Sequence, residues 1–454
     1  MIKTDLIIIG AGPGGYRAAG HAAQKGLKVV IFESDHVGGT CLNEGCIPTK
    51  AFARNAEIVQ TLKEASLFAL DNLSFDFRFQ QVVDRKNEIL SQLRAGIDTL
   101  LQQPGITLVP AEARFVDAHT VRVCCDAIAT NDDGLYTAPA IIVATGSQSK
   151  QLRLAEPPSR PVLDSRDLLQ LDHLPKSLCI IGAGVIGLEF ASIFSAFGTE
   201  VTVVEFLKEC LPALDSDIAK RLRKVLEKRG VVFNLQCGVT AITPDGVTFT
   251  NKKGKEETVQ AEQVLMAVGR APRVFDYFAQ AGFEYDARTG IKVDDNYETT
   301  VPGVFAIGDV NGRQMLAHAA EMQGIRVVNH ILGHDDDIDL SIMPAAIFTN
   351  PEAACVGPTE DQLKADGVDY ECRKAFHRAN GKALTMNEPE GMLKLFSEPD
   401  AGRILGCHAF GAHAADMVQE VSALMCRQTT VAQLRQMVHI HPTLGELVLA
   451  ASEQ

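Results

Sequence analysis

One pattern occurs twice in the chain and restricts its fold more than any other. It consists of a short apolar strand, a glycine-rich loop, a helix of small residues and a second strand that ends in a glutamate. The first copy joins strand 6–9, the loop GAGPGG at 10–15 and strand 29–32. The second copy joins strand 178–181, the loop GAGVIG at 182–187 and strand 201–204. The spacing from first glycine to glutamate is the same in both copies, so we predict an internal repeat of a βαβ nucleotide-binding unit.

Each glycine of the first copy has a separate task in such a unit. Gly10 makes the tight turn, Gly12 lets backbone N–H groups approach a pyrophosphate at the helix N-terminus, and Gly15 allows close helix packing. Glu33 is expected to accept hydrogen bonds from the ribose hydroxyls. The corresponding residues of the second copy are Gly182, Gly184, Gly187 and Glu205. We therefore expect two bound dinucleotides.

Glu205 also bears on which nucleotide binds the second copy. A carboxylate at this position binds a free ribose 2′-hydroxyl and repels a 2′-phosphate. Lys208 lies close by in the sequence and is the one nearby feature that would favour a phosphate. We predict NAD rather than NADP.

Cys41 and Cys46 lie in the segment GGTCLNEGCIPTK, residues 38–50. A disulfide between them requires a local bend, because bridged Cα atoms lie about 4.4–6.8 Å apart. Pro48 fits the first turn of a helix predicted over 48–56, and a helix N-terminus lowers thiol pKa. We interpret the pair as a redox-active disulfide. A plain buried pair and a zinc half-site are the alternatives, although zinc pairs usually leave two to four residues between ligands and need a second pair.

The segment HIHPTLGE near the C-terminus contains two histidines, His439 and His441, and the carboxylate Glu446. They are either scattered surface polarity or an acid/base pair in which Glu446 begins a helix and orients His441. Two dinucleotides and one disulfide make a short electron relay, and direct hydride transfer to a disulfide is slow, so the first nucleotide should be FAD. Thiol chemistry needs a group that accepts and donates protons, which favours the acid/base interpretation of His441.

We divide the chain into an FAD-binding domain over 1–150, completed by about 273–335, and an NAD-binding domain over 151–272 that follows a proline-rich linker at 156–161. A central segment, 273–340, and a C-terminal domain with an α+β pattern, 341–454, complete the chain. A helix over 75–103 and strands within 106–123 and at 141–144 are expected between the two glycine loops. The strand near 304–307 ends at Asp309, which is placed to hydrogen-bond a hydroxyl of the first nucleotide.

The net charge of −14 and the pI near 5.4 argue against nucleic acid or an anionic membrane as a partner. The longest apolar runs are strand-sized, and the first residues lack a signal-peptide profile. We expect a cytoplasmic protein with no metal site, in which most of the 11 cysteines serve packing. The adjacent Cys124 and Cys125 are a weaker candidate for a second redox or metal site.

The chain resembles the class I pyridine nucleotide-disulfide oxidoreductase family and, within it, is most similar to the dihydrolipoamide dehydrogenases. The matching motifs cover essentially the full length: the two glycine loops, the cysteine segment, ATGS at 144–147, VGRAP at 268–272, AIGD at 306–309, LAH at 316–318 and HPTLGE at 441–446. The cysteine segment is highly specific to the family, whereas the glycine loops alone are not. The resemblance implies an α/β fold with two Rossmann-like dinucleotide-binding domains and a C-terminal α+β dimerisation domain.

The resemblance also implies roles for individual residues. Cys46 would lie next to the flavin and Cys41 would exchange with the substrate, while His441, supported by Glu446, would deprotonate dihydrolipoamide at the disulfide of the other subunit of an obligate homodimer. Lys50 would lie by the flavin and pair with Glu189 near the nicotinamide. Further residues expected to bind FAD are Ala113, Thr145, Gly146, Ser147, Asp309, Met315, Ala317 and His318. Further residues expected to bind NAD are Val239 and Gly269.

The activity implied is the oxidation of a protein-bound dihydrolipoyl group with reduction of NAD to NADH. The partner would be the lipoylated carrier of a 2-oxoacid dehydrogenase complex, of the glycine cleavage system or of another lipoyl system. Three features depart from the family pattern: Glu44 and Thr49 replace a common valine and serine, and the lysine common after His318 is missing.

Other members of the same fold are the nearest alternatives. Glu205 speaks against glutathione-type reductases, and the tail 447–454 lacks the extra cysteine pair of mercuric reductases. A soluble transhydrogenase would lack the cysteine pair. A flavoprotein that serves mainly as a docking subunit of a larger complex is a further alternative, which loss of diaphorase activity would reveal.

Overall fold

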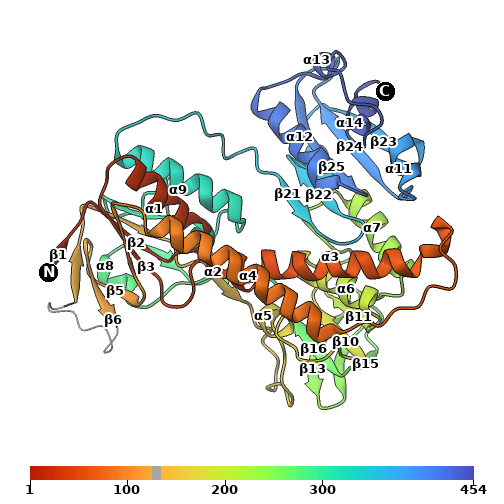
Figure 1. The fold of residues 1–454 in the computed structure, drawn as a ribbon, viewed down its shortest axis with the longest axis horizontal. Helices are drawn as coiled ribbons and strands as arrows, with labels where there is room; N and C mark the ends of the chain where they lie inside the picture. The colour runs from red at the N-terminus through yellow and green to blue at the C-terminus, as the bar shows by residue number, and fades with distance from the viewer. Residues whose placement is uncertain (125–133) are drawn as a thin grey trace. The chain divides into compact units, whose positions relative to one another are not determined.

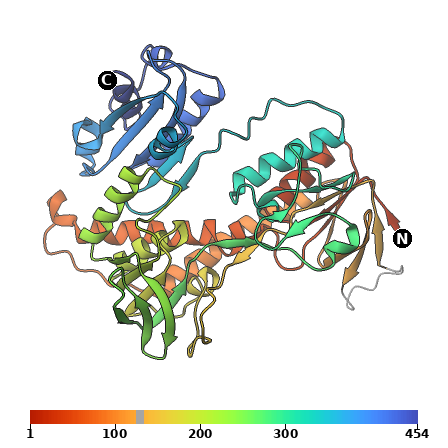
Figure 2. The same ribbon diagram turned by 180° about the vertical axis from the view of Figure 1, so that it is seen from behind.

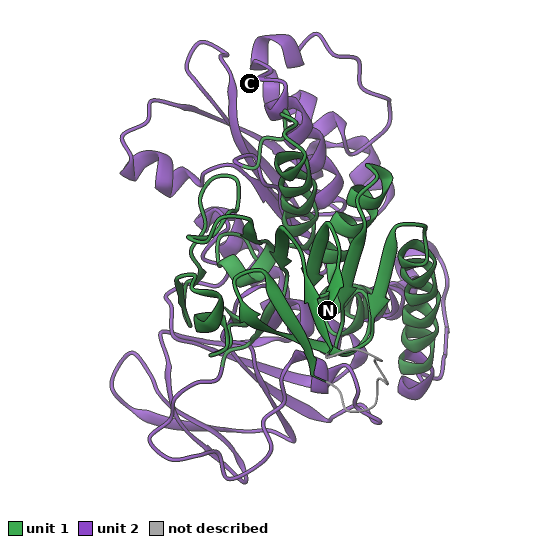
Figure 3. Cartoon of the chain, turned by 90° about the vertical axis from the view of Figure 1, so that its left-hand side faces the viewer, with its two compact units in different colours: residues 1–51, 83–150, 270–340 green, residues 52–82, 151–269, 341–454 purple. Residues whose placement is uncertain are grey.

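The computed structural model describes residues 1–124 and 134–454, so Cys125 of the adjacent cysteine pair lies outside the described residues. The chain forms two compact units, each assembled from three separate stretches (Figure 3). Unit 1 comprises Met1–Ala51, Val83–Lys150 and Arg270–Leu340. Unit 2 comprises Phe52–Val82, Gln151–Gly269 and Ser341–Gln454. Residues 52–82 thus group with unit 2 rather than with the rest of 1–150, and the domain boundaries given above remain predictions.

A parallel five-stranded sheet forms the centre of unit 1. Its strand order is β20-β8-β2-β3-β4, with bounds Val304–Ala306, Ala140–Val143, Leu6–Ile9, Val29–Phe32 and Ile106–Val109. Strand β20 pairs in parallel with β8, so a late segment of the chain completes the sheet that the first residues begin. Helices α1 (Pro13–Gln24) and α9 (Ala317–Ile331) lie side by side against this sheet (Figures 1 and 2).

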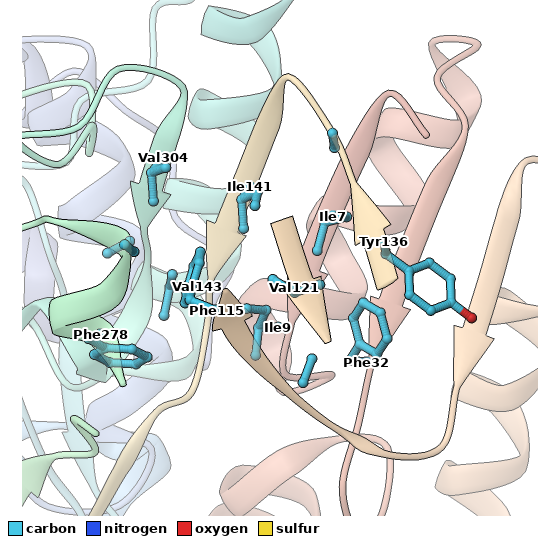
Figure 4. Close-up of a cluster of buried hydrophobic side chains, with 14 of the residues drawn as sticks. Ile7, Ile9, Phe32, Phe115, Val121, Tyr136, Ile141, Val143, Phe278 and Val304 are labelled. Carbon is cyan, nitrogen blue, oxygen red and sulfur yellow. The ribbon is translucent and has the colours of Figure 1, made fainter. Parts of the chain in front are cut away.

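The apolar runs of β2, β3, β8 and β20 are buried on both faces, as is typical of parallel sheets. On β2, Leu6 and Ile8 face one core and Ile7 and Ile9 face the other. The second core also contains Phe32 and residues of a smaller sheet, and Figure 4 shows these side chains gathered on one face of the strands. This packing fixes the carboxyl ends of the strands, where the predicted nucleotide residues lie.

The remaining elements of unit 1 surround the sheet. A four-stranded sheet has the order β1-β7-β6-β5, with bounds Ile2–Lys3, Leu135–Thr137, Thr120–Cys124 and Glu112–Asp117. Helices α2 (Gly39–Asn43) and α4 (Phe79–Leu101, mostly in unit 1), the first residues of α3 (Cys46–Lys63) and a short helix α8 (Phe278–Ala281) join them. The small strands β9 (Ser147–Ser149) and β17 (Arg270–Pro272) pair with each other, as do β18 (Tyr285–Asp286) and β19 (Gly290–Ile291).

Unit 2 contains the second nucleotide-binding repeat. Its parallel sheet has the order β12-β11-β10-β16, with bounds Val232–Leu235, Glu200–Glu205, Ser177–Ile181 and Gln263–Met266. The associated helices are α5 (Ser165–Leu168), α6 (Val185–Phe197) and α7 (Ser216–Lys228). A three-stranded sheet follows, formed by β13 (Gly238–Thr243), β14 (Gly246–Thr250) and β15 (Glu256–Gln260).

The C-terminal part of unit 2 is an antiparallel sheet covered by helices. Its order is β21-β22-β25-β24-β23, with bounds Ala345–Ile347, Ala353–Val356, Ile404–Phe410, Met392–Ser397 and Glu371–Phe376. The helices are α10 (Glu360–Ala365), α11 (Gly381–Thr385), α12 (Ala414–Cys426), α13 (Val431–Leu434) and α14 (Glu446–Ser452). Helix α12 packs on β22 and β25 (Figure 1).

The expected elements differ from the observed ones mainly in length. Helix α3 begins at Cys46 and continues to Lys63, well past the predicted end at residue 56. Phe52 and Ala56 are buried within the predicted part of the helix, and Val59 continues the same buried face beyond residue 56. Among the described residues, no helix is both long enough and apolar enough to cross a membrane.

Candidate active site

Cys41 and Cys46 form a disulfide in unit 1. Cys41 lies in the short helix α2, Cys46 is the first residue of α3, and their Cα atoms are 4.6 Å apart. This distance falls within the range that a disulfide spans. The chain bends between the two helices at Glu44, which ends α2, and at Gly45.

Within the described residues, no three His, Cys, Asp or Glu side chains gather in a way that could hold a metal ion.

The disulfide segment lies directly against the first glycine loop. The N–H of Gly38 donates to the carbonyl of Ala11 at 2.8 Å. Gly39 has a φ of +57°, and a Cβ there would come within 2.7 Å of the Cα of Gly12. Only glycine fits this contact, because the two backbones touch. The sequence thereby places the disulfide beside the predicted pyrophosphate loop.

Asn43 ties the same segment together. Its Nδ2 donates to the carbonyls of Val37 at 3.1 Å and Gly39 at 2.9 Å. Its Oδ1 accepts from Nε of Arg94, on α4, at 2.5 Å. Sequence reasoning missed Arg94, because nothing local links it to a residue 51 positions earlier.

The first glycine loop has the geometry that the sequence predicted. Gly10 has a φ of +106°, and a Cβ there would collide with the carbonyl oxygen of Ala144. A Cβ at Gly15 would collide with the carbonyl oxygen of Gly10, so α1 packs closely onto the loop. Helix α1 starts after Gly12 with no side-chain cap and no acidic residue in its first turn. Its N–H groups are therefore suited to a phosphate.

The second glycine loop repeats these contacts in unit 2. Gly182 has a φ of +105° and faces the carbonyl of Ala267, while Gly187 faces the carbonyl of Gly182. Helix α6 starts after Gly184, again without a side-chain cap, and a Cβ at Gly184 would meet nothing within 4 Å. Both loops thus fit a dinucleotide pyrophosphate.

The two acids predicted to bind ribose have equivalent backbone partners in the two repeats. One carboxylate oxygen of Glu33 accepts from the N–H of Ala11 at 2.8 Å, and the other accepts from Asp35 at 3.0 Å. Glu205 accepts in the same way from Ala183 at 2.5 Å and Leu207 at 2.7 Å. Each carboxylate is held at the end of its strand, next to the glycine loop of its own repeat.

Ser147 and Asp309 meet at the carboxyl edge of the unit 1 sheet. The hydroxyl of Ser147 donates to the carboxylate of Asp309, and Nε of Arg270 donates to that hydroxyl at 2.7 Å. Nη2 of Arg270 also donates to the backbone carbonyl of Ser147 at 2.8 Å. Burial raises the pKa of Asp309, against the opposing effects of Ser147 and Arg270. This polar cluster suits the hydroxyl groups of a nucleotide. Arg270 lies in a motif that was recognised, but no role had been predicted for it.

The other residues predicted for FAD occupy three places in unit 1. Thr145 and Gly146 follow β8, and Thr145 donates to the carbonyl of Arg273 at 2.9 Å. Met315, Ala317 and His318 surround the N-terminus of α9, which has no side-chain cap. Ala113 is buried in β5, in the smaller sheet. Their contacts with a cofactor remain predictions.

Of the residues predicted for NAD, Gly269 follows β16 with a φ of +106°. It thus lies with Gly182 and Glu205 at the carboxyl edge of the unit 2 sheet, where ligands of such folds bind. Val239 lies in β13, at an irregularity of its pairing with β14. Glu189 is buried in α6, and one of its carboxylate oxygens accepts from the N–H of Phe348 at 2.8 Å. Lys50 belongs to unit 1, so its pairing with Glu189 remains a prediction.

His441 and Glu446 form a hydrogen-bonded pair in unit 2. Nδ1 of His441 lies 2.9 Å from one carboxylate oxygen of Glu446, the first residue of α14. The other oxygen accepts from the N–H of Thr443 at 2.8 Å. That N–H and His441 lower the pKa of Glu446, so the carboxylate stays charged and fixes the imidazole. The His441 side chain is 80% exposed.

A disulfide at a helix start, two dinucleotide loops and an imidazole–carboxylate pair define a disulfide oxidoreductase that uses two dinucleotides. Comparison with known families agrees. Residues 4–324 match the model described as pyridine nucleotide-disulphide oxidoreductase, and residues 343–451 match the dimerisation domain of the same family. The chain belongs to the pyridine nucleotide-disulphide oxidoreductase family.

Relatives and solved structures cover the whole chain. The dihydrolipoyl dehydrogenase of Geobacillus stearothermophilus is 37% identical, over 100% of this chain and 96% of its own. The crystal structure of LpdA from Mycobacterium tuberculosis has a TM-score of 0.90 at 26% identity, over 100% of this chain and 99% of its own. The Cu(II) complex of the HOCl-induced flavoprotein disulfide reductase RclA from Escherichia coli has a TM-score of 0.87 at 28% identity, with the same coverage of both chains.

These findings confirm the predicted family, fold class and enzyme class, and with them FAD and NAD as cofactors. The matched dimerisation domain indicates a homodimer.

Proposed function

We propose that the protein is a dihydrolipoyl dehydrogenase, which oxidises a dihydrolipoyl group on a carrier protein and reduces NAD to NADH. The Cys41–Cys46 disulfide beside the first glycine loop is the observation that carries the proposal. The full-length similarity to dihydrolipoyl dehydrogenases supports this choice of substrate.

The chain's own residues account for the thiol chemistry. His441 of one chain takes the proton of a substrate thiol at Nε2, because Nδ1 is held by Glu446. The thiolate forms a bond to Sγ of Cys41, and the Cys41–Cys46 bond breaks with its electron pair on Cys46. The second substrate thiol then displaces Cys41, closes the lipoyl disulfide and leaves two reduced cysteines and two protons. FAD, when bound, supplies the step that passes this electron pair to NAD as a hydride.

The position of Cys46 favours this direction of bond cleavage. It is the first residue of α3, where the partial positive charge of the helix stabilises a thiolate. The more easily a sulfur leaves as a thiolate, the faster thiol–disulfide exchange proceeds. Cys46 is thus the better leaving group and Cys41 the sulfur that meets the substrate.

Another disulfide substrate is the second candidate. Glu44 places a carboxylate between the two cysteines, where the family commonly has valine, and the RclA structure shows that the same fold serves a different disulfide reductase. A protein that binds flavin but does not oxidise dihydrolipoamide would favour this candidate.

The carrier and the location are also part of the proposal. The carrier is a lipoylated protein of a 2-oxoacid dehydrogenase complex, of the glycine cleavage system or of another lipoyl system. Eight of the described cysteines are free, which fits a reducing compartment such as the cytoplasm.

The first experiment is a visible spectrum of the purified protein, followed by an anaerobic assay of NAD reduction with dihydrolipoamide, with NADP as the control. We expect a flavin spectrum and NADH formation that greatly exceeds NADPH formation. A flavin spectrum without NADH formation would contradict the proposed substrate and leave the fold and the family intact.

A further inference from the structure

The segment that carries His441 has little regular structure of its own. It runs from Leu434, at the end of α13, to Leu444, just before α14, and both of these leucines are buried. Between them Val438 is 99% exposed and Ile440 is 79% exposed. His439 is the exception, because its side chain is only 10% exposed. One histidine therefore points into the protein two residues before the one that points out.

His439 forms a second imidazole–carboxylate pair. Its Nε2 lies 2.9 Å from Oε1 of Glu420, on α12, and its Nδ1 lies 3.2 Å from the carbonyl oxygen of Met437. The ring thus joins its own segment to the helix beneath it. No role was predicted from the sequence for either residue.

The second pair also contacts the far side of the segment. A Cβ at Gly445 would lie 3.6 Å from Oε2 of Glu420 and 3.9 Å from Cδ2 of His439. Gly445 directly precedes Glu446, the partner of His441. The pair His439–Glu420 is therefore packed against the backbone on both sides of His441.

Side chains supply the other contacts that hold this segment. Thr443 donates through its hydroxyl to the carbonyl of Ile440 at 2.7 Å, and Nδ2 of Asn380 donates to the carbonyl of Thr443 at 3.0 Å. Among the described residues, neither a helix nor a strand includes 435–445. Side-chain hydrogen bonds thus contribute much of what positions His441. On its N-terminal side they are the bond of Arg435 to the carbonyl of Ser452 and, closer to His441, the bond between His439 and Glu420.

We propose that His439 and Glu420 are a positioning pair that holds His441 at the geometry needed for proton transfer. The proposal rests on the proposed function, in which His441 is the base. His439 does not itself exchange protons with the substrate. A shift of about 1 Å in a catalytic group costs on the order of 10²-fold in rate, so loss of this hydrogen bond should affect turnover without affecting cofactor binding.

The test compares conservative and disruptive variants in the purified holoenzyme. His439→Gln keeps an N–H donor that can reach Glu420, whereas His439→Leu does not. Glu420→Gln keeps an acceptor for the ring, whereas Glu420→Ala does not. Asp416→Ala is the matched control, because Asp416 forms an exposed pair with His413 at 3.1 Å on the same helix.

We expect His439→Leu and Glu420→Ala to lower kcat for dihydrolipoamide oxidation by roughly tenfold or more, with little change in KM. His439→Gln, Glu420→Gln and Asp416→Ala should stay within about twofold of the unaltered enzyme. Flavin content and diaphorase activity, which do not require His441, should be unchanged in all five. The double variant His439→Leu/Glu420→Ala should be no slower than the slower single variant, because both remove one interaction. Unchanged kcat in His439→Leu, or equal losses in the conservative and disruptive variants, would overturn the proposal.

Amide hydrogen exchange separates this proposal from the proposed function. In peptides that cover residues 437–446, His439→Leu and Glu420→Ala should exchange roughly fivefold faster, the factor expected for one ordinary hydrogen bond. The conservative variants should match the unaltered protein. If the unaltered protein fails to oxidise dihydrolipoamide, the proposed function fails and this measurement still decides the positioning. If both disruptive variants exchange at the same rate as the unaltered protein, the positioning role of His439 and Glu420 is overturned.

Discussion

The ammonium of Lys394 lies 2.8 and 2.9 Å from the two carboxylate oxygens of Asp215, and both side chains are only 1% exposed. Asp215 caps the N-terminus of α7, next to the second nucleotide-binding sheet, and Lys394 belongs to β24 of the C-terminal sheet. Glu360 adds a third charge, 2.5 Å from the same ammonium. This buried group therefore fixes α7 of the second nucleotide-binding repeat to the C-terminal sheet, and loss of one charge leaves the others uncompensated.

Glu360→Gln should make the melting temperature depend less on pH in the acidic range. Burial raises the pKa of Glu360, but hydrogen bonds from Lys394 and Lys364 outweigh it and lower the pKa from 4.5 to about 2. A lowered pKa contributes stability above about pH 4.5 that is lost as the pH falls toward 2. The difference in melting temperature between Glu360→Gln and the unaltered protein should be largest near pH 7 and should shrink below pH 4.5. A constant difference would refute the assignment. Glu398→Gln, which removes an exposed pair with Arg403, is the control and should have little effect.

Cys41→Ser and Cys46→Ser should each abolish dihydrolipoamide oxidation and leave flavin bound. Either change removes the disulfide, whereas the glycine loop and the Ser147–Asp309 contact remain. Turnover and the flavin spectrum are measured on the same samples. Cys426→Ser, at an exposed free cysteine, is the control. Normal turnover in either disulfide variant would show that these cysteines are not the redox pair.

His441→Gln should lower dihydrolipoamide oxidation by a factor on the order of 10² or more, the usual scale for loss of a general acid or base. Diaphorase activity should persist, since that route needs no substrate thiol. His173→Gln is the control, because His173 is an exposed histidine with carboxylates within 3.0 Å. A near-normal rate would show that His441 is an ordinary exposed polar residue and not the base.

Glu205→Gln should relax the preference for NAD over NADP. The neutral amide no longer repels a 2′-phosphate, and its oxygen still accepts one of the two backbone N–H groups that the carboxylate binds. The measurement is the ratio of kcat/KM for the two nucleotides. Glu200→Gln, at the exposed start of the same strand, should leave the ratio unchanged. If Glu205→Gln has the same ratio as the unaltered enzyme, Glu205 does not determine the preference for NAD over NADP.

Gly15→Ala and Gly187→Ala should separate the two nucleotide sites. Each adds a methyl group that collides with the first glycine of its own loop. Gly15→Ala should lose flavin, whereas Gly187→Ala should keep flavin and bind NADH more weakly. Gly96→Ala, in α4 with no atom within 4 Å of the new methyl, is the control. Loss of flavin in Gly187→Ala would mean that the loops were assigned to the wrong nucleotides.

The sequence predicted the parts of the fold that depend on local chemistry. Positive φ at Gly10 and Gly182, the helix beginning at Glu446 and the strand near 304–307 all follow from short patterns. The ion pair of Lys394 with Asp215 was not predicted, because Asp215 lies 179 positions away and nothing in either segment specifies the other.

In the candidate site, too, features within short sequence motifs could be predicted, whereas contacts between distant residues could not. The disulfide, the glycine loops and the His441–Glu446 pair lie within continuous motifs, so they could be predicted. Arg270, which binds Ser147 from 123 positions away, and Glu420, which holds His439, depend on how elements pack. Pairing across strands and helices is set by the whole core, and such residues become evident only in three dimensions.

The assembly of the unit 1 sheet has a consequence for synthesis of the chain on the ribosome. Strand β8 is apolar and fully buried, yet its outer neighbour β20 belongs to a segment made only after the entire second nucleotide-binding repeat. Until residues 304–306 emerge, the nascent sheet exposes an unpaired hydrophobic edge, which is prone to association with other chains. The first domain to be translated is thus among the last to be completed, and truncated chains would be clients for chaperones.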